Sequence, residues 1–310
     1  MPRFNKSKKL HDLLLRWYRS NKRPLPWRKT RNPYRILVSE VMLQQTQVSR
    51  VKKKYSLFIK RYPTLQSLAR APVADAIRSW QGMGYNQRVL RLKRFAKEVV
   101  ENYGGQIPEE IKALQSLPGV GQYTAHAIAC FAFNQPVPVG DVNVSRVLSR
   151  VFKRMKSVSD RSDNETVWKL ARQILPEKDV PHWNQALMDL GATVCTARRP
   201  LCATCPVSAL CLSAHVLLHS IGEAGVRSAT REKLYRGLPV RIYRGRIVEG
   251  LRRLNGSSTI ELSRLGRLIK PDFTGTEIPW LRSVTQKLAE DGLVELGKRK
   301  NKILVRLPRT

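Results

Sequence analysis

The chain has 310 residues, which at roughly 150 residues per domain predicts about two domains. Its hydrophobic fraction of 42% is large enough for packed cores and excludes wholesale disorder, and no segment approaches the roughly 18 consecutive apolar residues of a membrane span. The 57 Lys and Arg against 23 Asp and Glu give a formal net charge of +34, which indicates a polyanionic partner, nucleic acid first and an anionic membrane surface as the alternative.

Hydrophobic periodicity predicts helices through most of the chain, separated by turns that contain Pro or Gly. In chain order the predicted helices cover residues 8–21, 36–60, 73–80, 89–103, 111–116, 124–133, 142–153 and 168–175. Few runs in this part alternate between apolar and polar residues, so we expect an all-α body.

The character of the sequence changes after Cys211. Residues 216–237 carry Gly, Ser and scattered charge, which predicts a connector. Three predicted helices follow (242–254, 260–269, 280–291), and then two strands (293–296, 303–307) that flank a basic turn. This order is typical of a winged helix-turn-helix. Residues 225–310 hold 20 Lys and Arg and 8 acids, so the domain could bind DNA, with a solvated charged surface as the plainer alternative.

The five cysteines are unevenly placed. Cys130 lies in an apolar run and is predicted to be a buried thiol. The other four have the spacing Cys195-x6-Cys202-x2-Cys205-x5-Cys211. Disulfides are disfavoured in a reducing compartment, so a metal centre is the better interpretation. Four thiolates suit zinc or a [4Fe–4S] cluster, and this spacing lacks the paired knuckles that are usual for zinc.

A glycine-containing motif, LPGVGQYTA at 117–125, predicts a tight turn between two helices. Gly119 and Gly121 let the backbone approach a ligand closely, and the N–H groups at the start of the second helix attract phosphate. By its physics alone the motif also fits a simple turn between helices. Its sequence resembles the helix-hairpin-helix of DNA repair glycosylases almost letter for letter.

A third signal lies near the N-terminus, in LPWR at 25–28 and SEVMLQQTQV at 39–48. On a helix Glu40, Leu43, Gln44 and Gln47 share a face, which sets a carboxylate beside amides that can bond base edges. Spacing alone fits a solvent-exposed Glu40 equally well.

Together with GMGY at 82–85 and DVNVSRV at 141–147, these motifs resemble the MutY-type adenine DNA glycosylase family of the helix-hairpin-helix and endonuclease III superfamily. The resemblance runs from about residue 8 to about residue 213. It implies an all-α, two-domain body with an iron–sulfur cluster loop, and it makes a [4Fe–4S] cluster the cofactor. The implied metal ligands are Cys195, Cys202, Cys205 and Cys211.

The expected domains follow from this resemblance and from the change in composition. The glycosylase body covers residues 1–215, with a helical domain at about 27–134 and a cluster domain from about 1–26 plus 135–215. A connector (216–237) then leads to a small, basic, winged-helix-like α+β domain (238–310).

The resemblance also implies the catalytic roles. Glu40 matches the acid that protonates the purine, so burial should raise its pKa. Asp141 matches the carboxylate that stays ionised and stabilises an oxocarbenium-like sugar. Tyr123 occupies the position where bifunctional lyases carry a Lys that forms a Schiff base, so the enzyme should leave the DNA strand intact.

Further residues match positions that touch DNA. The expected adenine pocket contains Trp27, Arg28 and Gln185, and the expected contacts to the orphaned base and the DNA backbone are Gln45, Thr46, Tyr85, Gly119 and Gly121. Core packing is the alternative for the aromatic residues of this set, and a surface amide is the alternative for Gln185.

Three features depart from the family pattern. Asp141 follows Gly140, where an apolar residue is usual, and it precedes Val142, where Gly or Thr is common. Asn86 follows Tyr85, where a second Tyr is frequent. Long members also carry a MutT-like domain that recognises 8-oxoguanine, and the C-terminal part of this chain has neither its length nor its strand-rich pattern.

The expected function is that of a monofunctional DNA glycosylase of base excision repair, which flips and excises adenine mispaired with 8-oxoguanine or guanine. The alternative is a thymine or uracil mismatch glycosylase of the same superfamily, against which the LPWR and QQT motifs argue. A non-catalytic DNA-binding protein is a third hypothesis. The basic start lacks the apolar stretch of a secretory signal, so we expect a soluble cytoplasmic monomer, nucleoid-associated in a prokaryote, with double-stranded DNA and no membrane as its partner.

Overall fold

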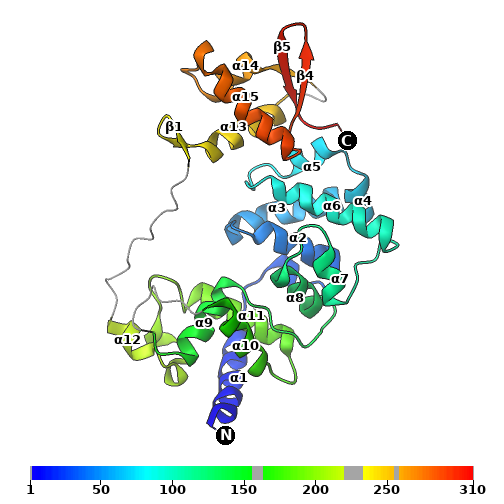
Figure 1. Cartoon of the computed structure of the whole chain (residues 1–310). Helices are drawn as coiled ribbons and strands as arrows, with labels where there is room; N and C mark the ends of the chain where they lie inside the picture. The colour runs from blue at the N-terminus through cyan, green and yellow to red at the C-terminus, as the bar shows by residue number, and fades with distance from the viewer. Residues whose placement is uncertain (1, 156–162, 220–232, 255–257, 310) are drawn as a thin grey trace. The chain divides into compact units, whose positions relative to one another are not determined.

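A computed structural model describes residues 2–155, 163–219, 233–254 and 258–309 of the chain (Figure 1). The chain forms two compact units. Unit 1 comprises Met1–Leu37, Glu109–Ser116 and Val120–Arg227, and unit 2 comprises Val38–Pro108, Leu117–Gly119 and Ser228–Thr310. Unit 1 therefore takes residues 27–37 and both helices of the hairpin, which the domain boundaries expected from the sequence placed with the helical domain. Within the described ranges, no helix is long and apolar enough to cross a membrane.

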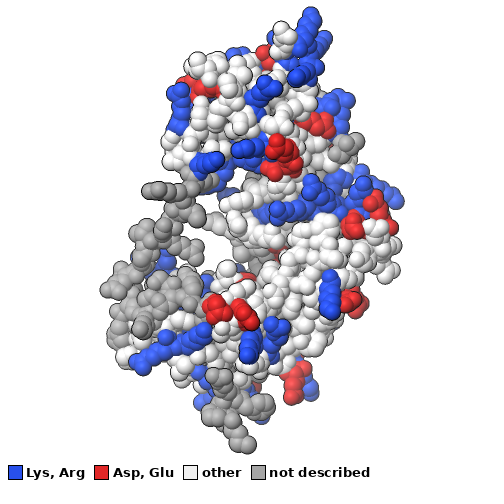
Figure 2. All heavy atoms as spheres, in the orientation of Figure 1, with Lys and Arg blue, Asp and Glu red and all other residues white. Residues whose placement is uncertain are grey.

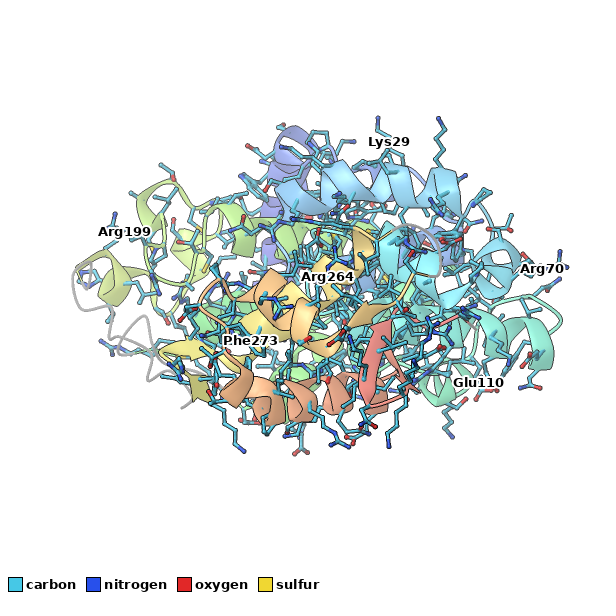
Figure 3. The ribbon with its side chains drawn as sticks, turned by 90° about the horizontal axis from the view of Figure 1, so that it is seen from above. Lys29, Arg70, Glu110, Arg199, Arg264 and Phe273 are labelled. Atoms are coloured by element: carbon cyan, nitrogen blue, oxygen red, sulfur yellow. The ribbon has the colours of Figure 1, made fainter. Side chains whose placement is uncertain are left out.

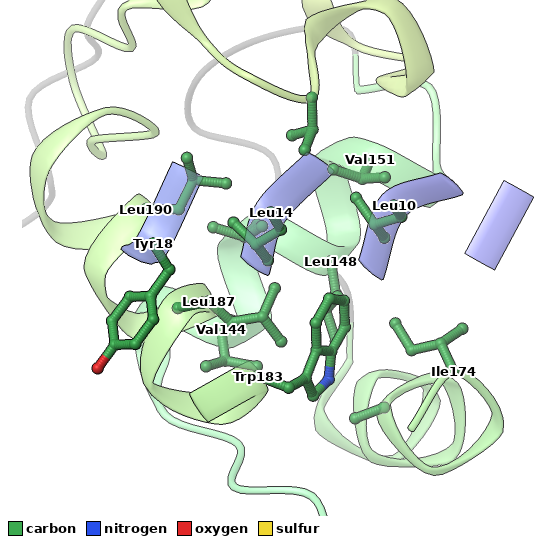
Figure 4. Close-up of a cluster of buried hydrophobic side chains, with 14 residues drawn as sticks. Leu10, Leu14, Tyr18, Val144, Leu148, Val151, Ile174, Trp183, Leu187 and Leu190 are labelled. Atoms are coloured by element: carbon green, nitrogen blue, oxygen red, sulfur yellow. The ribbon is translucent and has the colours of Figure 1, made fainter. Parts of the chain in front are cut away.

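Unit 1 is helical and is built around three helices from distant parts of the chain. The N-terminal α1 (Pro2–Asn21) packs against α9 (Val142–Phe152) and α11 (Val180–Thr193). Their shared core includes Leu14, Leu148 and Trp183 (Figure 4). The remaining elements of the unit are η1 (Pro26–Arg28), α7 (Ile111–Ser116), α8 (Gln122–Phe131), α10 (Asn164–Gln173), η2 (Cys202–Thr204), η3 (Ser208–Leu210) and α12 (Ala214–His219).

The first part of unit 2 is also helical. It contains α2 (Pro33–Leu43, which begins in unit 1), α3 (Val48–Arg61), α4 (Leu65–Arg70), α5 (Val73–Ser79) and α6 (Gln87–Asn102). The single helix expected over residues 36–60 is wrong. Gln45 has a φ of +54°, in the left-handed region, so the chain leaves the helix after Leu43 and starts a new one at Val48.

The C-terminal part of unit 2 is a small α+β segment. Its elements are β1 (Leu234–Tyr235), β2 (Leu238–Pro239), α13 (Val240–Arg252), β3 (Ile260–Glu261), α14 (Leu262–Ile269), η4 (Gly275–Glu277), α15 (Ile278–Glu290), β4 (Glu295–Arg299) and β5 (Lys302–Arg306). The strands β3, β5 and β4 form an antiparallel sheet in that order, with Val305 paired to both Ile260 and Leu296. Of the residues predicted as a connector, 220–232 lie outside the described residues.

Candidate functional site

Glu40 lies on α2 in the most apolar stretch of that helix. Residues 36–42 are all buried, and the Glu40 side chain is 6% exposed. Burying a carboxyl group among apolar side chains is costly unless its environment is built for it, so a surface Glu is excluded at this position.

Asp141 is the N-cap of α9 and is held as a hydrogen-bond acceptor on both oxygens. Its Oδ1 accepts from the backbone N–H groups of Asn143 (2.9 Å) and Val144 (2.7 Å), and its Oδ2 accepts from the Asn143 side-chain amide (2.8 Å). Arg146 donates to the Asn143 side-chain oxygen (2.8 Å) and to the Cys195 carbonyl (2.8 Å). A chain of hydrogen bonds therefore links Asp141 to the backbone of the cysteine loop.

The structure accounts for one unusual neighbour of Asp141. A Cβ atom at Gly140 would lie 3.0 Å from the ring of Trp168, so the indole fills the space that an apolar side chain would otherwise take. On the other side of Asp141, Val142 is 78% exposed, and no contact in the structure explains why valine occupies this position.

The predicted hairpin is present as α7, a tight turn and α8. Gly119 has a φ of +79°, and a Cβ there would lie 2.9 Å from the Cβ of Arg91, so this position requires glycine for two reasons. Gly121 is the N-cap of α8. Tyr123 follows in the first turn of α8 and packs against the buried group that includes Cys130 and Val180.

Two arginines from the N-terminal segment converge on one buried acid of α11. Arg28 donates through both terminal nitrogens to the two oxygens of Asp189 (2.7 and 2.8 Å), and Arg23 donates from Nε (2.5 Å). The Asp189 side chain is 0% exposed. Burial acts to raise the pKa of Asp189, but the hydrogen bonds and charges of Arg28 and Arg23 outweigh it and lower the pKa. The guanidinium of Arg28 is therefore a structural partner of Asp189.

Gln185 lies one turn before Asp189 on α11 and is oriented by Tyr18. The Tyr18 hydroxyl donates to Gln185 Oε1 at 2.6 Å, and the guanidinium of Arg28 lies 5.9 Å from the centre of the Tyr18 ring. Trp27, in η1, is buried. Arg28 and Gln185 thus belong to one polar cluster of unit 1, which also contains Tyr18, Arg23 and Asp189. Trp27 precedes Arg28 in η1.

In unit 2 a buried arginine of α6 joins two turns. Arg88 donates to backbone carbonyls of the α2–α3 turn (Val41, Met42, Gln44) and of the α5–α6 turn (Met83, Gly84). Burial lowers its pKa to about 10, so it stays charged at neutral pH. One side chain therefore fixes both turns.

These two turns carry the predicted DNA contacts of this unit. Gln45 and Tyr85 have φ values of +54° and +44°, and Tyr85 is 57% exposed. Left-handed backbone in non-glycine residues is strained and is found preferentially at functional sites. The Thr46 hydroxyl accepts from Arg88 (2.9 Å) and lies 3.4 Å from the Met83 carbonyl, so it serves the connection between the turns.

The four clustered cysteines line one cavity. Arg150 donates to Cys195 Sγ (3.4 Å) and to the Thr196 carbonyl (2.7 Å). Burial is the largest of the effects that raise the pKa of the Cys205 thiol to about 11, and charge on Cys195, Cys211 and Cys202 also contributes. In the part of the chain that the structure describes, no three His, Cys, Asp or Glu side chains converge on a single ion. Four thiols that line one cavity without forming a site for a single ion fit a cluster better than one zinc ion, which needs four sulfurs at about 2.3 Å.

Comparison with known proteins gives this arrangement a family. Residues 38–175 match the family described as "HhH-GPD superfamily base excision DNA repair protein", and residues 195–211 match the iron–sulfur binding domain of endonuclease III. The adenine DNA glycosylase of Mycolicibacterium smegmatis is 38% identical over 290 residues, which cover 91% of each chain. The chain belongs to the adenine DNA glycosylase family. The match over residues 195–211 supports a [4Fe–4S] cluster as its cofactor.

The other similarities cover less of the chain. The human adenine DNA glycosylase is 46% identical over 207 residues, which are 64% of this chain and 38% of the human protein, so the chain spans well under half of that relative. Among solved structures, a thermostable thymine-DNA glycosylase has a TM-score of 0.65 and 33% identity and covers 69% of this chain and 99% of its own.

Sequence reasoning missed several residues that hold the site together. Asp189 could have been found, because a lone acid in an apolar helix needs a cation. Arg88 also left a signal, since it falls on the same helical face as Leu92, Phe95 and Val99 of α6. No sequence pattern pointed to Tyr18, because its hydrogen-bond partner Gln185 is 167 positions away in the sequence.

Proposed function

We propose that this member of the adenine DNA glycosylase family hydrolyses the N-glycosidic bond of adenine mispaired with 8-oxoguanine or guanine in double-stranded DNA. The observation that carries the proposal is the burial of Glu40 in the apolar stretch of α2. A carboxyl group placed there is suited to hold and deliver a proton.

The proposed reaction divides the work between two carboxyl groups. Glu40 gives its proton to the purine ring, and the bond between the base and C1′ of the sugar then breaks. The electron pair of the broken bond leaves with adenine. Asp141 stabilises the oxocarbenium-like sugar, and water then adds at C1′ to leave an abasic site. The hydrogen bonds that Asp141 accepts at the start of α9 fix its orientation.

The polar cluster of unit 1 supports recognition of the base. Because Gln185 Oε1 accepts from Tyr18, its amide nitrogen is the end that can donate to a ring nitrogen of adenine. Arg28 acts through Asp189, as the clamp that fixes η1 against α11. Tyr123 offers no amine for a Schiff base, so we propose that strand cleavage does not accompany base removal.

The partner that we propose is duplex DNA. Lys and Arg side chains are spread over the face drawn in Figure 2, in keeping with the net charge of +34. The element order α13, β3, α14, α15, β4, β5 supports a winged helix in the C-terminal segment, with Lys298, Arg299 and Lys300 exposed at the end of the β4–β5 wing. Such a wing would add contacts to phosphates.

Removal of thymine or uracil from a mismatch is the second candidate. The observation in its favour is the thymine-DNA glycosylase structure, whose chain is covered almost completely by the body of this one.

Glu40→Gln tests the catalytic proposal. We expect single-turnover excision of adenine to fall at least a hundredfold while binding to the mismatched duplex is retained, because the amide keeps the shape and loses the acidic proton. Glu101→Gln, at an exposed position on α6, is the matched control and should keep full activity. Excision by Glu40→Gln at the wild-type rate would refute the assignment.

A further inference from the structure

The chain reaches Asp141 through an irregular segment, residues 134–140, that lies between α8 and α9. The segment carries Pro136 and Pro138, which have no N–H group and favour an extended conformation in the residue before each of them. Pro138 and Val139 are nevertheless buried. Buried backbone groups outside helices and sheets need hydrogen-bond partners from elsewhere, so neighbouring side chains must hold this segment.

Asn184 of α11 holds the segment on both sides of Pro138. Its side-chain oxygen accepts from the Val139 N–H (3.0 Å), and its amide nitrogen donates to the Val137 carbonyl (3.0 Å). Asn184 is 1% exposed. An amide can accept at one end and donate at the other, so this one buried side chain satisfies two backbone groups of the segment.

His126 of α8 holds Pro138 itself. The His126 Nδ1 atom lies 2.9 Å from the Pro138 carbonyl oxygen. A carbonyl oxygen can only accept, so Nδ1 carries the proton and donates it to this hydrogen bond. Burial lowers the pKa of His126 below its usual value of 6.5, so the ring is neutral at neutral pH.

Trp168 of α10 connects His126 with the last residue before Asp141. The His126 ring meets the Trp168 indole edge to face, with the ring centres 4.8 Å apart. The same indole lies 3.0 Å from the place that a Cβ atom of Gly140 would take. His126 therefore acts on the approach to Asp141 twice, through the Pro138 carbonyl and through the indole that packs on Gly140.

We propose that His126 is a positioning residue for Asp141. The inference rests on the proposed function, in which Asp141 stabilises the sugar cation. The hydrogen bonds that Asp141 accepts come from the first turn of α9, so they orient the carboxylate relative to that helix. The contacts of His126 fix the preceding segment relative to α8. A catalytic group displaced by about 1 Å can lose about a hundredfold in rate, so this second constraint matters for the chemistry.

The test separates the rate of the reaction from the binding of DNA. His126→Asn keeps an amide nitrogen at the place of Nδ1, whereas His126→Gln moves it to the place of Nε2, away from the Pro138 carbonyl. We expect His126→Gln and His126→Ala to lower the single-turnover rate of adenine excision by about tenfold or more. His126→Asn should recover most of that loss. The dissociation constant for a duplex with non-cleavable 2′-fluoro adenosine should stay unchanged in all three.

His11 of α1 provides a matched control in the same unit. Its Nε2 lies 2.7 Å from the Ile174 carbonyl oxygen, and its ring meets Trp183 edge to face at 4.6 Å, so it repeats both contacts of His126 on a different segment. His11→Ala should lower the melting temperature and keep the excision rate of the folded protein. Glu110→Gln, at an exposed position just before α7 (Figure 3), should change neither.

Equal excision rates in His126→Asn and His126→Gln would refute the proposal, also if His126→Ala does not fold. Rates that fall with the melting temperature in the His11 and His126 variants alike would show a purely structural role. Asp141→Asn distinguishes the proposal from the function on which it rests. Full activity of Asp141→Asn would refute the proposed catalysis, whereas a slow Asp141→Asn beside a fast His126→Gln would refute the positioning role alone.

Discussion

Asp189 shows how one buried residue can organise a recognition site. Its two oxygens accept from Arg23 and from both terminal nitrogens of Arg28, and its side chain is closed to solvent. Breaking a buried ion pair on one side leaves an uncompensated charge, which costs much more than the pair contributes when intact. The position of η1, and with it Trp27, therefore depends on this carboxylate.

Asp189→Asn should lower the free energy of unfolding by about 3–5 kcal/mol, because it leaves two partly buried guanidinium groups without their buried countercharge. Urea unfolding measures the change, and Asp12→Asn, at an exposed position on α1, should stay within about 0.5 kcal/mol of wild type. A loss under about 1 kcal/mol in Asp189→Asn would contradict the role of the pair.

The stabilisation that ionised Asp189 provides through Arg23 and Arg28 depends on pH. The pKa of Asp189 is lowered in the folded state, so its stabilisation is complete above the unfolded value of 3.8 and is lost as the pH falls through the folded pKa. The difference in stability between wild type and Asp189→Asn should therefore shrink below about pH 3.8. A difference that grows on acidification would show that Asp189 is not an ionised partner.

At the scale of elements, the α2–α3 and α5–α6 turns act as one body because Arg88 connects them. Periodicity predicted most helices within a few residues, but it merged α2 with α3. The side chains around the break suit a helix, and the break shows only in the backbone, where Gln45 is left-handed and Gln47 is extended. The helix predicted over 260–269 also wrongly included the two residues of β3. A strand this short has no alternation to detect, and its two residues pair with β5 residues that are 45 and 43 positions away.

Arg88→Lys should loosen both turns, since a lysine cannot reproduce the planar fork that reaches five carbonyls. We expect a loss of about 2–3 kcal/mol in unfolding free energy and faster hydrogen exchange at residues 44–47 and 82–86. Arg94→Lys, at an exposed position on the same helix, is the control. Unchanged exchange at both turns in Arg88→Lys would refute the coupling.

Across the whole molecule, the sequence predicted features whose residues lie close together in the chain, and it did not predict contacts between distant segments. The cysteine spacing and the hairpin motif lie within short stretches, and both are found where they were predicted. The packing of α1 against α11 and the docking of α13 on α5 and α6 join segments far apart in the chain. Such contacts leave no periodic trace, so they could not be inferred from the sequence.

The net charge of +34 makes a prediction for the whole chain in its complex with DNA. Binding to duplex DNA should weaken steeply with salt, by about a thousandfold between about 50 and 200 mM for about six phosphate contacts, because each contact releases counterions. Fluorescence anisotropy over this range measures the slope. A flat salt response would contradict the claim that the charge serves DNA.

The most direct test of the account is a single-turnover assay on duplexes with A, T or U opposite 8-oxoguanine or guanine, developed with and without hot alkali. We expect that only A is removed and that strands break only after alkali, because we propose that Glu40 and Asp141 cut the glycosidic bond, and Tyr123 has no amine for a lyase reaction. Release of T or U in place of A would contradict it and would assign the chain the mismatch activity of the thymine-DNA glycosylase that its body resembles.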